Sequence, residues 1–197
     1  WNAVWMIMTR AGLSKKQYHG EKYGVWFVKD PRKIKQIKQY YPDLPNFKTR
    51  GFNLNQVPHC LSVNDLRNTL EHSPKITVDG WLSESYILAL PIESRDGITV
   101  NKVPDAIFWI RRKDGSRKKY FLEYERTLKN LARYEQIFKF YEERGDVERK
   151  SVFYVCKDDF IKQRLKKTED ELAKIGKLNK RDEWFQFFTI DEFKESL

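Results

Sequence analysis

The chain has 197 residues, of which 40% are hydrophobic and 34% charged, and its formal net charge is +10. This length suits one full hydrophobic core with a smaller appendage, and no apolar run approaches the roughly 20 residues of a membrane span. We expect no signal peptide, and two cysteines are too few for a disulfide framework, so we expect a cytoplasmic protein without a membrane partner.

The positive charge is concentrated in the first third of the chain. Residues 1–60 carry 11 Lys or Arg against 3 acids, whereas residues 61–197 carry 27 against 25. Such a region is the electrostatic footprint of a phosphate-binding surface, and the alternative is a basic surface that only confers solubility. We expect a DNA-binding region over residues 1–58 and one α/β domain over residues 59–197. Because the chain begins at Trp1, we also expect its true N-terminus to be missing.

The basic region is predicted to contain two short strands and a helix. Strand-like runs cover Val4–Arg10 and Gly24–Val28, and Pro31–Tyr41 has the spacing of a basic amphipathic helix. We interpret the strands as the remaining wing of a winged helix, and the alternative is that they extend the main sheet. The residues expected to contact DNA here are Lys15, Lys16, Lys33, Lys35, Lys38, Lys48 and Arg50.

A helix and one or two strands are predicted next. Ser62 is the expected N-cap of a helix that runs to His72. The segment Ile76–Leu90 is expected to be strand and to carry Glu84, and a lone Glu in a strand usually faces solvent. None of the three histidines has metal-ligand spacing, so His59, like the others, is interpreted as a surface or core residue.

The stretch Val103–Thr127 has the signature of a β-hairpin. Two alternating apolar runs, Ala106–Ile110 and Tyr120–Tyr124, flank a charged connection that contains Asp114 and Gly115. Antiparallel pairing of these runs brings the start of the first and the end of the second together.

Three acids lie at this open end of the hairpin. Asp105 precedes the first run, and Glu123 and Glu125 share one face of the second because side chains alternate with period two. Asp105 joins that face only if the loop has an odd number of residues, for instance three, since a one-residue slip flips every side chain. If the three acids form one site, the loop is therefore predicted to have an odd number of residues. The alternative is that the acids form a solvated strand end.

Clustered carboxylates raise one another's pKa unless a hard cation neutralises them. Mg²⁺, or Mn²⁺ in its place, takes oxygen ligands and usually needs only one or two carboxylates beside a phosphate oxygen of the substrate. We expect Asp105, Glu123 and Glu125 to be the metal ligands, with a metal-activated water attacking a phosphodiester.

A helix is predicted to follow over residues 128–144. A basic side chain near the acids would orient the attacking water or neutralise the phosphate. Lys129 is the first candidate because it is closest to Glu125, and Lys139 ranks lower. Arg133, on the same helix, is a candidate DNA contact. The alternative for each is a solvating surface charge.

The rest of the chain is predicted to complete a mixed sheet flanked by helices. Ser151–Cys156 reads as a buried strand, parallel to the second hairpin strand because a helix connects the two. A helix over residues 158–175, a strand over Trp184–Thr189 and a helix over Asp191–Leu197 follow.

The order Asp, hairpin, Glu-x-Glu and basic helix resembles the PD-(D/E)XK, or restriction-endonuclease-like, nuclease fold. The local amino-acid sequence of Val103–Thr127 is most similar to that of replication-relaxation proteins and the related MobC-like relaxases of mobilisable plasmids. Trp81–Glu84 resembles a Trp-x-x-Glu element ahead of the Asp strand, and Leu61–Leu70 the helix that opens the nuclease-like domain. Glu125 stands where the motif has a lysine, so either a lysine has migrated to the next helix or catalysis is altered or lost.

The resemblance implies a metal-dependent DNA-nicking relaxase that acts at a plasmid transfer origin, with Glu84 as a candidate fourth acid. It also implies an auxiliary relaxosome protein and a coupling protein as partners. Tyr124 is predicted to face away from the acids, which disfavours a tyrosine nucleophile. The alternative is a DNA-binding replication or transcription accessory protein with an inactive nuclease fold, and an RNA-directed nuclease is a third hypothesis.

Overall fold

The computed structural model describes residues 13–16, 25–28, 56–90, 102–144, 147–179 and 184–196. The chain divides into two compact units, residues 1–46 and 47–197, so the division falls earlier than the predicted boundary after residue 58.

In the first unit, strand β1 (Leu13–Lys16) pairs antiparallel with β2 (Val25–Val28). A strand was predicted for the second of these segments but not for the first. The predicted strand at 4–10 and helix at 31–41 lie outside the described residues, as do Lys33, Lys35, Lys38, Lys48, Arg50 and the side chains of Lys15 and Lys16.

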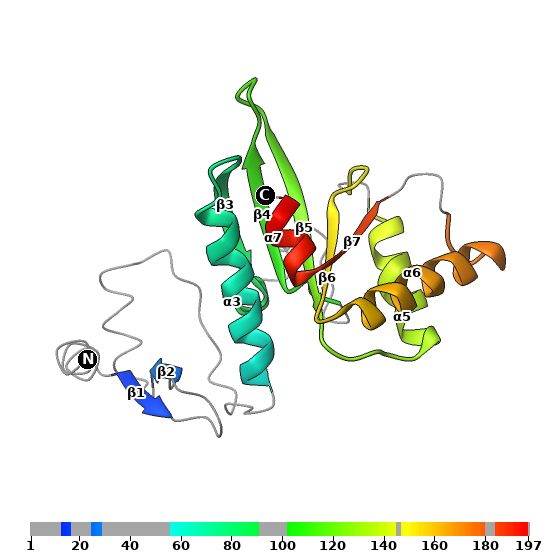
Figure 1. The fold of residues 1–197 in the computed structure, drawn as a ribbon, viewed down its shortest axis with the longest axis horizontal. Helices are drawn as coiled ribbons and strands as arrows, with labels where there is room; N and C mark the ends of the chain where they lie inside the picture. The colour runs from blue at the N-terminus through cyan, green and yellow to red at the C-terminus, as the bar shows by residue number, and fades with distance from the viewer. Residues whose placement is uncertain are drawn as a thin grey trace. The chain divides into compact units, whose positions relative to one another are not determined.

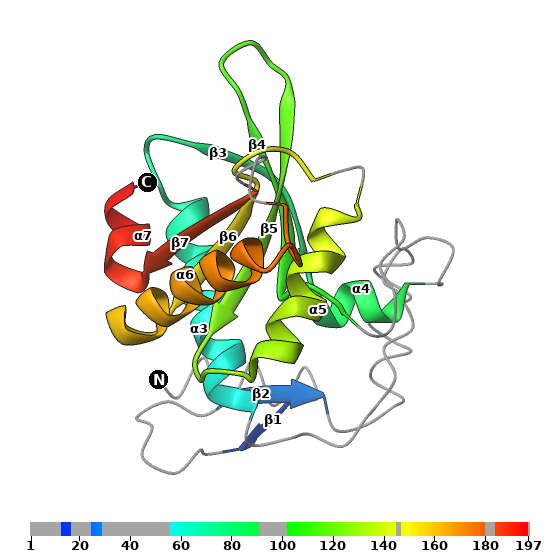
Figure 2. The ribbon, with the colours of Figure 1, turned by 90° about the vertical axis from the view of Figure 1, so that its right-hand side faces the viewer.

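The second unit is a five-stranded mixed sheet with helices on both faces (Figures 1 and 2). The strand order is β3-β4-β5-β6-β7; the first three strands are antiparallel, and β6 and β7 run parallel to β5. Its elements are α3 (Val57–Glu71), β3 (Thr77–Ser83), α4 (Glu84–Ala89), β4 (Ala106–Arg111), β5 (Arg117–Glu125), α5 (Leu131–Glu142), β6 (Val152–Cys156), α6 (Asp159–Lys174), β7 (Phe185–Thr189) and α7 (Ile190–Ser196). The prediction of an α/β fold with a mixed sheet flanked by helices is confirmed.

Two apolar clusters hold the helices to the sheet. Phe121 on β5 packs in the cluster formed with α5 and α6, whereas its neighbour Leu122 packs in the cluster formed with α3 and α7. This alternation is the period-two pattern of a strand that is covered on both faces. All five residues of β6 are buried, so this strand forms the centre of the core.

The register of the β4–β5 hairpin agrees with the parity argument. Ala106 pairs with Leu122, so continuing the ladder by one residue places Asp105 opposite Glu123. Arg112 N donates to Ser116 O at 2.8 Å, which leaves a three-residue loop that ends in Gly115 at φ +83°. A glycine accepts this left-handed conformation without strain. The predicted odd-numbered loop is confirmed.

The predicted start of the first long helix is wrong. Helix α3 begins at Val57 with Pro58 in its first turn, a position that tolerates the missing N–H of proline. Ser62 is therefore inside the helix, where its hydroxyl donates to Pro58 O at 3.0 Å instead of capping the helix.

The predicted strand character of residues 84–90 is also wrong. Strand β3 ends at Ser83, whose side chain accepts a hydrogen bond from Tyr86 N at 3.3 Å and so caps α4. Glu84 is the first residue of this short helix and does not lie in a strand.

The helix after the hairpin starts three residues later than predicted. Asn130 caps α5 by accepting a hydrogen bond from Arg133 N at 2.9 Å. The strands and helices that follow lie close to their predicted positions, and β6 is parallel to β5 as expected. No helix within the described ranges combines the length and apolar character needed to cross a membrane.

Candidate active site

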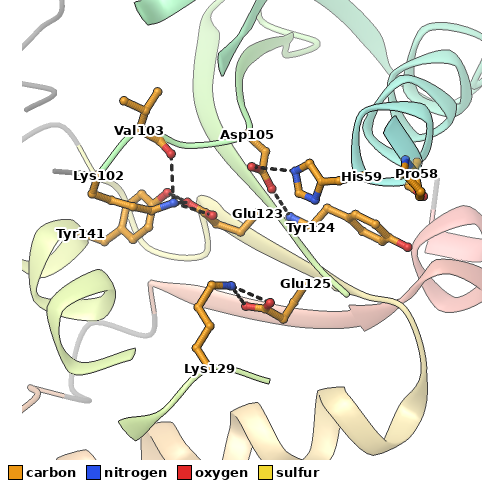
Figure 3. Close-up of polar contacts among 11 residues, drawn as sticks. Pro58, His59, Lys102, Val103, Asp105, Glu123, Tyr124, Glu125, Lys129 and Tyr141 are labelled. Carbon is orange, nitrogen blue, oxygen red and sulfur yellow. Dashed lines mark hydrogen bonds and ion pairs between the residues drawn. The ribbon is translucent and has the colours of Figure 1, made fainter. Parts of the chain in front are cut away.

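The three predicted acids lie at the open end of the β4–β5 hairpin (Figure 3). Asp105 directly precedes β4, and Glu123 and Glu125 belong to the last three residues of β5. The two glutamates are only 7% and 3% exposed. Their carboxylates lie beneath a helical layer, so each needs a partner that offsets the loss of hydration.

Lys102 is the partner of Glu123. Its Nζ lies 2.6 Å from Glu123 Oε1 and 2.7 Å from Oε2, and it also donates to Val103 O at 3.0 Å. From α5, the Tyr141 hydroxyl donates to Glu123 Oε1. The pKa of Glu123 is raised to about 7, chiefly by burial; the charge of Lys102 opposes this rise, and the charge of Asp105 adds to it.

Asp105 is fixed from two sides. Its Oδ2 accepts a hydrogen bond from Tyr124 N at 2.7 Å, and its Oδ1 lies 3.0 Å from His59 Nε2 on α3. The hydrogen bond to Asp105 raises the pKa of His59, against the opposing effect of burial. The Tyr124 ring packs in the α3 cluster, on the face opposite to the glutamates as predicted.

Lys129 is the partner of Glu125. The ammonium group binds the carboxylate from the segment between β5 and α5, four residues along the chain. The same segment is held in place because Lys129 N donates to the Tyr134 hydroxyl at 3.0 Å. The predicted contact between this lysine and the acids is therefore present, although Lys129 precedes the helix instead of lying within it.

Glu84 lies beside Asp105 through its backbone, since Glu84 N donates to Asp105 O at 3.0 Å. Desolvation and the charge of Asp105 raise the pKa of Glu84, and the charges of His59 and Lys102 oppose that rise. The candidate fourth acid is thus an electrostatic neighbour of the site.

Two other predicted residues are engaged along α5 itself. Lys139 pairs with Glu135 at 3.1 Å, and Glu135 also binds Lys177 at 2.7 Å. Arg133 donates to Gln136 at 3.2 Å. These contacts give Lys139 the role of a surface ion-pair partner, the alternative that its sequence position left open.

Sequence reasoning missed two basic residues of the site, His59 and Lys102. His59 reaches Asp105 only because α3 starts early and packs on the sheet. Lys102 reaches Glu123 across 21 positions of sequence. Its position shortly before Asp105 was the available signal, because a segment that enters the first hairpin strand must pass the end of the second.

Two of the carboxylates are suited to a divalent cation. Among the described residues, no three His, Cys, Asp or Glu side chains are grouped to hold a metal ion. Mg²⁺ nevertheless needs only one or two carboxylates, and Asp105 and Glu123 supply hard oxygen donors at the open end of the hairpin. Lys102 Nζ already lies among three oxygens, those of Glu123 and Val103, so this place accommodates a positive charge.

Comparison with known proteins gives no match. No protein-family model, no curated protein and no solved structure matches the chain. The residues and contacts of the open end are therefore the basis on which a function is assigned.

Proposed function

We propose that the chain is a metal-dependent DNA-nicking enzyme of the relaxase type, which cleaves a phosphodiester at a plasmid transfer origin. The observation that carries the proposal is the hairpin register, whose last pair, Ala106 with Leu122, brings Asp105 and Glu123 to the same end of the sheet with basic side chains beside both. A register shifted by one residue would have separated these two acids onto opposite faces.

Asp105 and Glu123 are the residues that would hold Mg²⁺ or Mn²⁺. When bound, the ion would lower the pKa of a water or stabilise charge on the phosphate. Tyr124 N and His59 fix the Asp105 carboxylate, while Lys102 Nζ keeps a positive charge at the Glu123 oxygens. The Lys102 ammonium group, held in this way, is suited to stabilising a phosphate that gains negative charge.

Glu125 has a different role in this proposal. Glu125 stands where the nuclease motif has a lysine. Because it binds Lys129, an ammonium group still lies at this end of the sheet. This supports the hypothesis that the lysine has migrated, with Lys129 as the replacement, whereas Lys139 pairs with Glu135 within α5.

The mixed sheet, the Asp before β4 and the Glu-x-Glu that ends β5 support the PD-(D/E)XK resemblance. The basic first third of the chain supports DNA as the substrate, with a winged-helix-like region as the part that holds it. An auxiliary relaxosome protein, a coupling protein and a cytoplasmic location would follow from this function.

A second candidate function is a DNA-binding accessory protein whose nuclease fold is inactive. The observation that favours it is one-to-one pairing, since His59, Lys102 and Lys129 each contact one acid. A site that is already balanced by the protein's own cations has no electrostatic need for a metal.

Nicking of supercoiled plasmid that bears a candidate transfer origin tests both functions. Wild type is compared with Asp105→Asn and Glu123→Gln, in Mg²⁺, in Mn²⁺ and in EDTA, and the exposed α6 residue Glu171 supplies the matched control Glu171→Gln. Metal-dependent open circles are expected from wild type and the control, with the rate reduced at least about a hundredfold in the two site variants.

Two results would contradict the proposed nicking activity. Site variants that nick like wild type would show that other residues cut. A wild type that binds DNA in a salt-sensitive way but does not nick would favour the accessory protein.

A further inference from the structure

The far end of the same hairpin carries a concentration of positive charge. The hairpin tip, defined as Arg111–Lys119, contains six Lys or Arg against a single acid, Asp114. Residues 111–117 are all exposed. The charge surplus noted for the first third of the chain therefore has a second, more local counterpart inside the sheet domain.

The hairpin tip projects from the sheet. Strand β6 begins to pair at Phe121, so residues 117–120 of β5 and the loop extend past it. Both views of the ribbon show the tip standing clear of the other elements (Figures 1 and 2). A two-stranded ribbon of this kind has the dimensions that enter the major groove of B-DNA.

Contacts at its base hold the tip in a defined shape. Asp79 Oδ2 on β3 lies 2.9 Å from Arg111 Nη2 and 2.9 Å from Arg117 Nε, so it joins the two strands. In the loop, Asp114 Oδ1 accepts from Ser116 N at 2.9 Å and from Ser116 Oγ at 2.6 Å. A ribbon that is already ordered loses little conformational freedom on binding.

A basic turn lies beside the ribbon. Lys118 Nζ donates to Arg149 O at 2.8 Å, which places the Arg149–Lys150 turn next to the stem of the hairpin. The acid of this turn, Glu148, is shared between Arg112 at 3.4 Å and Lys118 at 3.7 Å. Arg149 and Lys150, both exposed, thus add positive charge beside the hairpin.

We propose that the hairpin tip is a DNA-binding element, which lies in a groove of duplex DNA and pairs its Arg and Lys side chains with the flanking phosphates. From Arg117 to Glu125 the strand is eight residue steps long, or about 26 Å, which corresponds to about eight base pairs of duplex. The tip therefore holds DNA at one end of the sheet while the acids lie at the other. This binding goes beyond the proposed cleavage and does not depend on it.

The test is binding of a fluorescent 30-base-pair duplex in EDTA over a series of salt concentrations, so that cleavage does not contribute. The tip variant is Arg112→Gln with Lys113→Gln, and the control is Lys166→Gln with Lys174→Gln on the exposed side of α6, which removes the same charge. The tip variant is expected to bind roughly tenfold more weakly or worse near 0.1 M salt, and its slope of log affinity against log salt is expected to fall by about 1.8. The control is expected to change affinity less than about twofold.

Equal losses in the tip variant and the control would overturn the proposal, because they would show that only net charge matters. A tip variant that binds like wild type would overturn it as well. If the double variant is less stable than wild type, the single substitution Lys113→Glu repeats the test at a loop position.

The other partner class is tested in parallel with vesicles of anionic phospholipid. Vesicle binding as strong as duplex binding, with the same dependence on the tip, would contradict a DNA-specific element. Duplex binding that is lost in the tip variant while vesicle binding stays weak in both proteins would support it.

Discussion

The two ends of the β4–β5 hairpin carry charge in opposite ways. At the open end the acids are largely buried and each has one basic partner; the pairs are Asp105 with His59, Glu123 with Lys102, and Glu125 with Lys129. At the tip, the Lys and Arg side chains of residues 111–117 are exposed, and the six basic residues of the tip outnumber its one acid. Buried, paired charges hold the carboxylates in defined positions, as catalysis requires. Exposed positive charges in excess of the acids can bind a polyanion.

This contrast explains why one strand can serve two purposes. Strand β5 is covered on both faces near Glu125 and is free of β6 near Arg117, so the local dielectric differs along its length. The same carboxylate or ammonium interacts strongly at the covered end and is screened by salt at the free end. Substitutions at the two ends should therefore differ in kind as well as in size.

The largest expected effect on stability is a pH dependence at Glu123. Its pKa is about 7 in the folded protein against an ordinary value of 4.5, so the folded state binds this proton more tightly than the unfolded state does. The free energy of unfolding of wild type, taken relative to Glu123→Gln, should therefore be constant below about pH 4.5, fall by about 3 kcal/mol up to about pH 7, and then level off. Urea unfolding in EDTA at several pH values measures this, and a difference that rises with pH would refute it.

A smaller effect is expected from Lys129→Met, which leaves the Glu125 carboxylate without its ammonium partner. We expect a loss of about 2 kcal/mol, less than for a fully buried pair because Lys129 is 40% exposed. Lys139→Met is the matched control, since Lys139 is 41% exposed and pairs within its own helix, and it should lose only about 0.5 kcal/mol. Equal losses in thermal or urea unfolding would show that Glu125 is not a buried charge that depends on Lys129.

The smallest effect on stability is expected from Asp79→Asn, at the base of the tip. Exposed ion pairs contribute little, so the free energy of unfolding should change by less than about 1 kcal/mol. Affinity for duplex DNA should rise several-fold, because Arg111 and Arg117 lose an acid that competes with phosphate. Removal of an acid would thus strengthen function at the tip and abolish it at the open end. Weaker DNA binding by this variant in the same fluorescence assay would mean that Asp79 acts by positioning the ribbon.

Local features of the sequence predicted the hairpin and much of its chemistry. Alternating apolar residues gave the strands, and the requirement that Asp105 face Glu123 gave the odd-numbered loop. The nearness of Lys129 to Glu125 followed from four residues of separation. These successes all concern contacts within one hairpin or to the segment that directly follows it.

The residues that sequence reasoning missed depend on tertiary packing. His59 reaches Asp105 from α3, a helix that starts earlier than predicted, with Pro58 in its first turn. The hydrophobic periodicity of a helix does not indicate which strand its end will contact. Glu84 was assigned to a strand because the capping role of Ser83 was not recognised. The exposure of the hairpin tip depends on where β6 begins, which the sequence of the hairpin does not contain.

Single-turnover nicking at saturating protein tests the division between the two ends most directly. With Mg²⁺ and all DNA bound, the tip variant Arg112→Gln with Lys113→Gln should cut at the wild-type rate, because only its affinity is reduced. Asp105→Asn should stay at least about a hundredfold slower at every protein concentration, with its DNA affinity unchanged within about twofold. Cutting by Asp105→Asn at the wild-type rate, or a tip variant that is bound but inactive, would contradict the assignment of chemistry to the open end and binding to the tip.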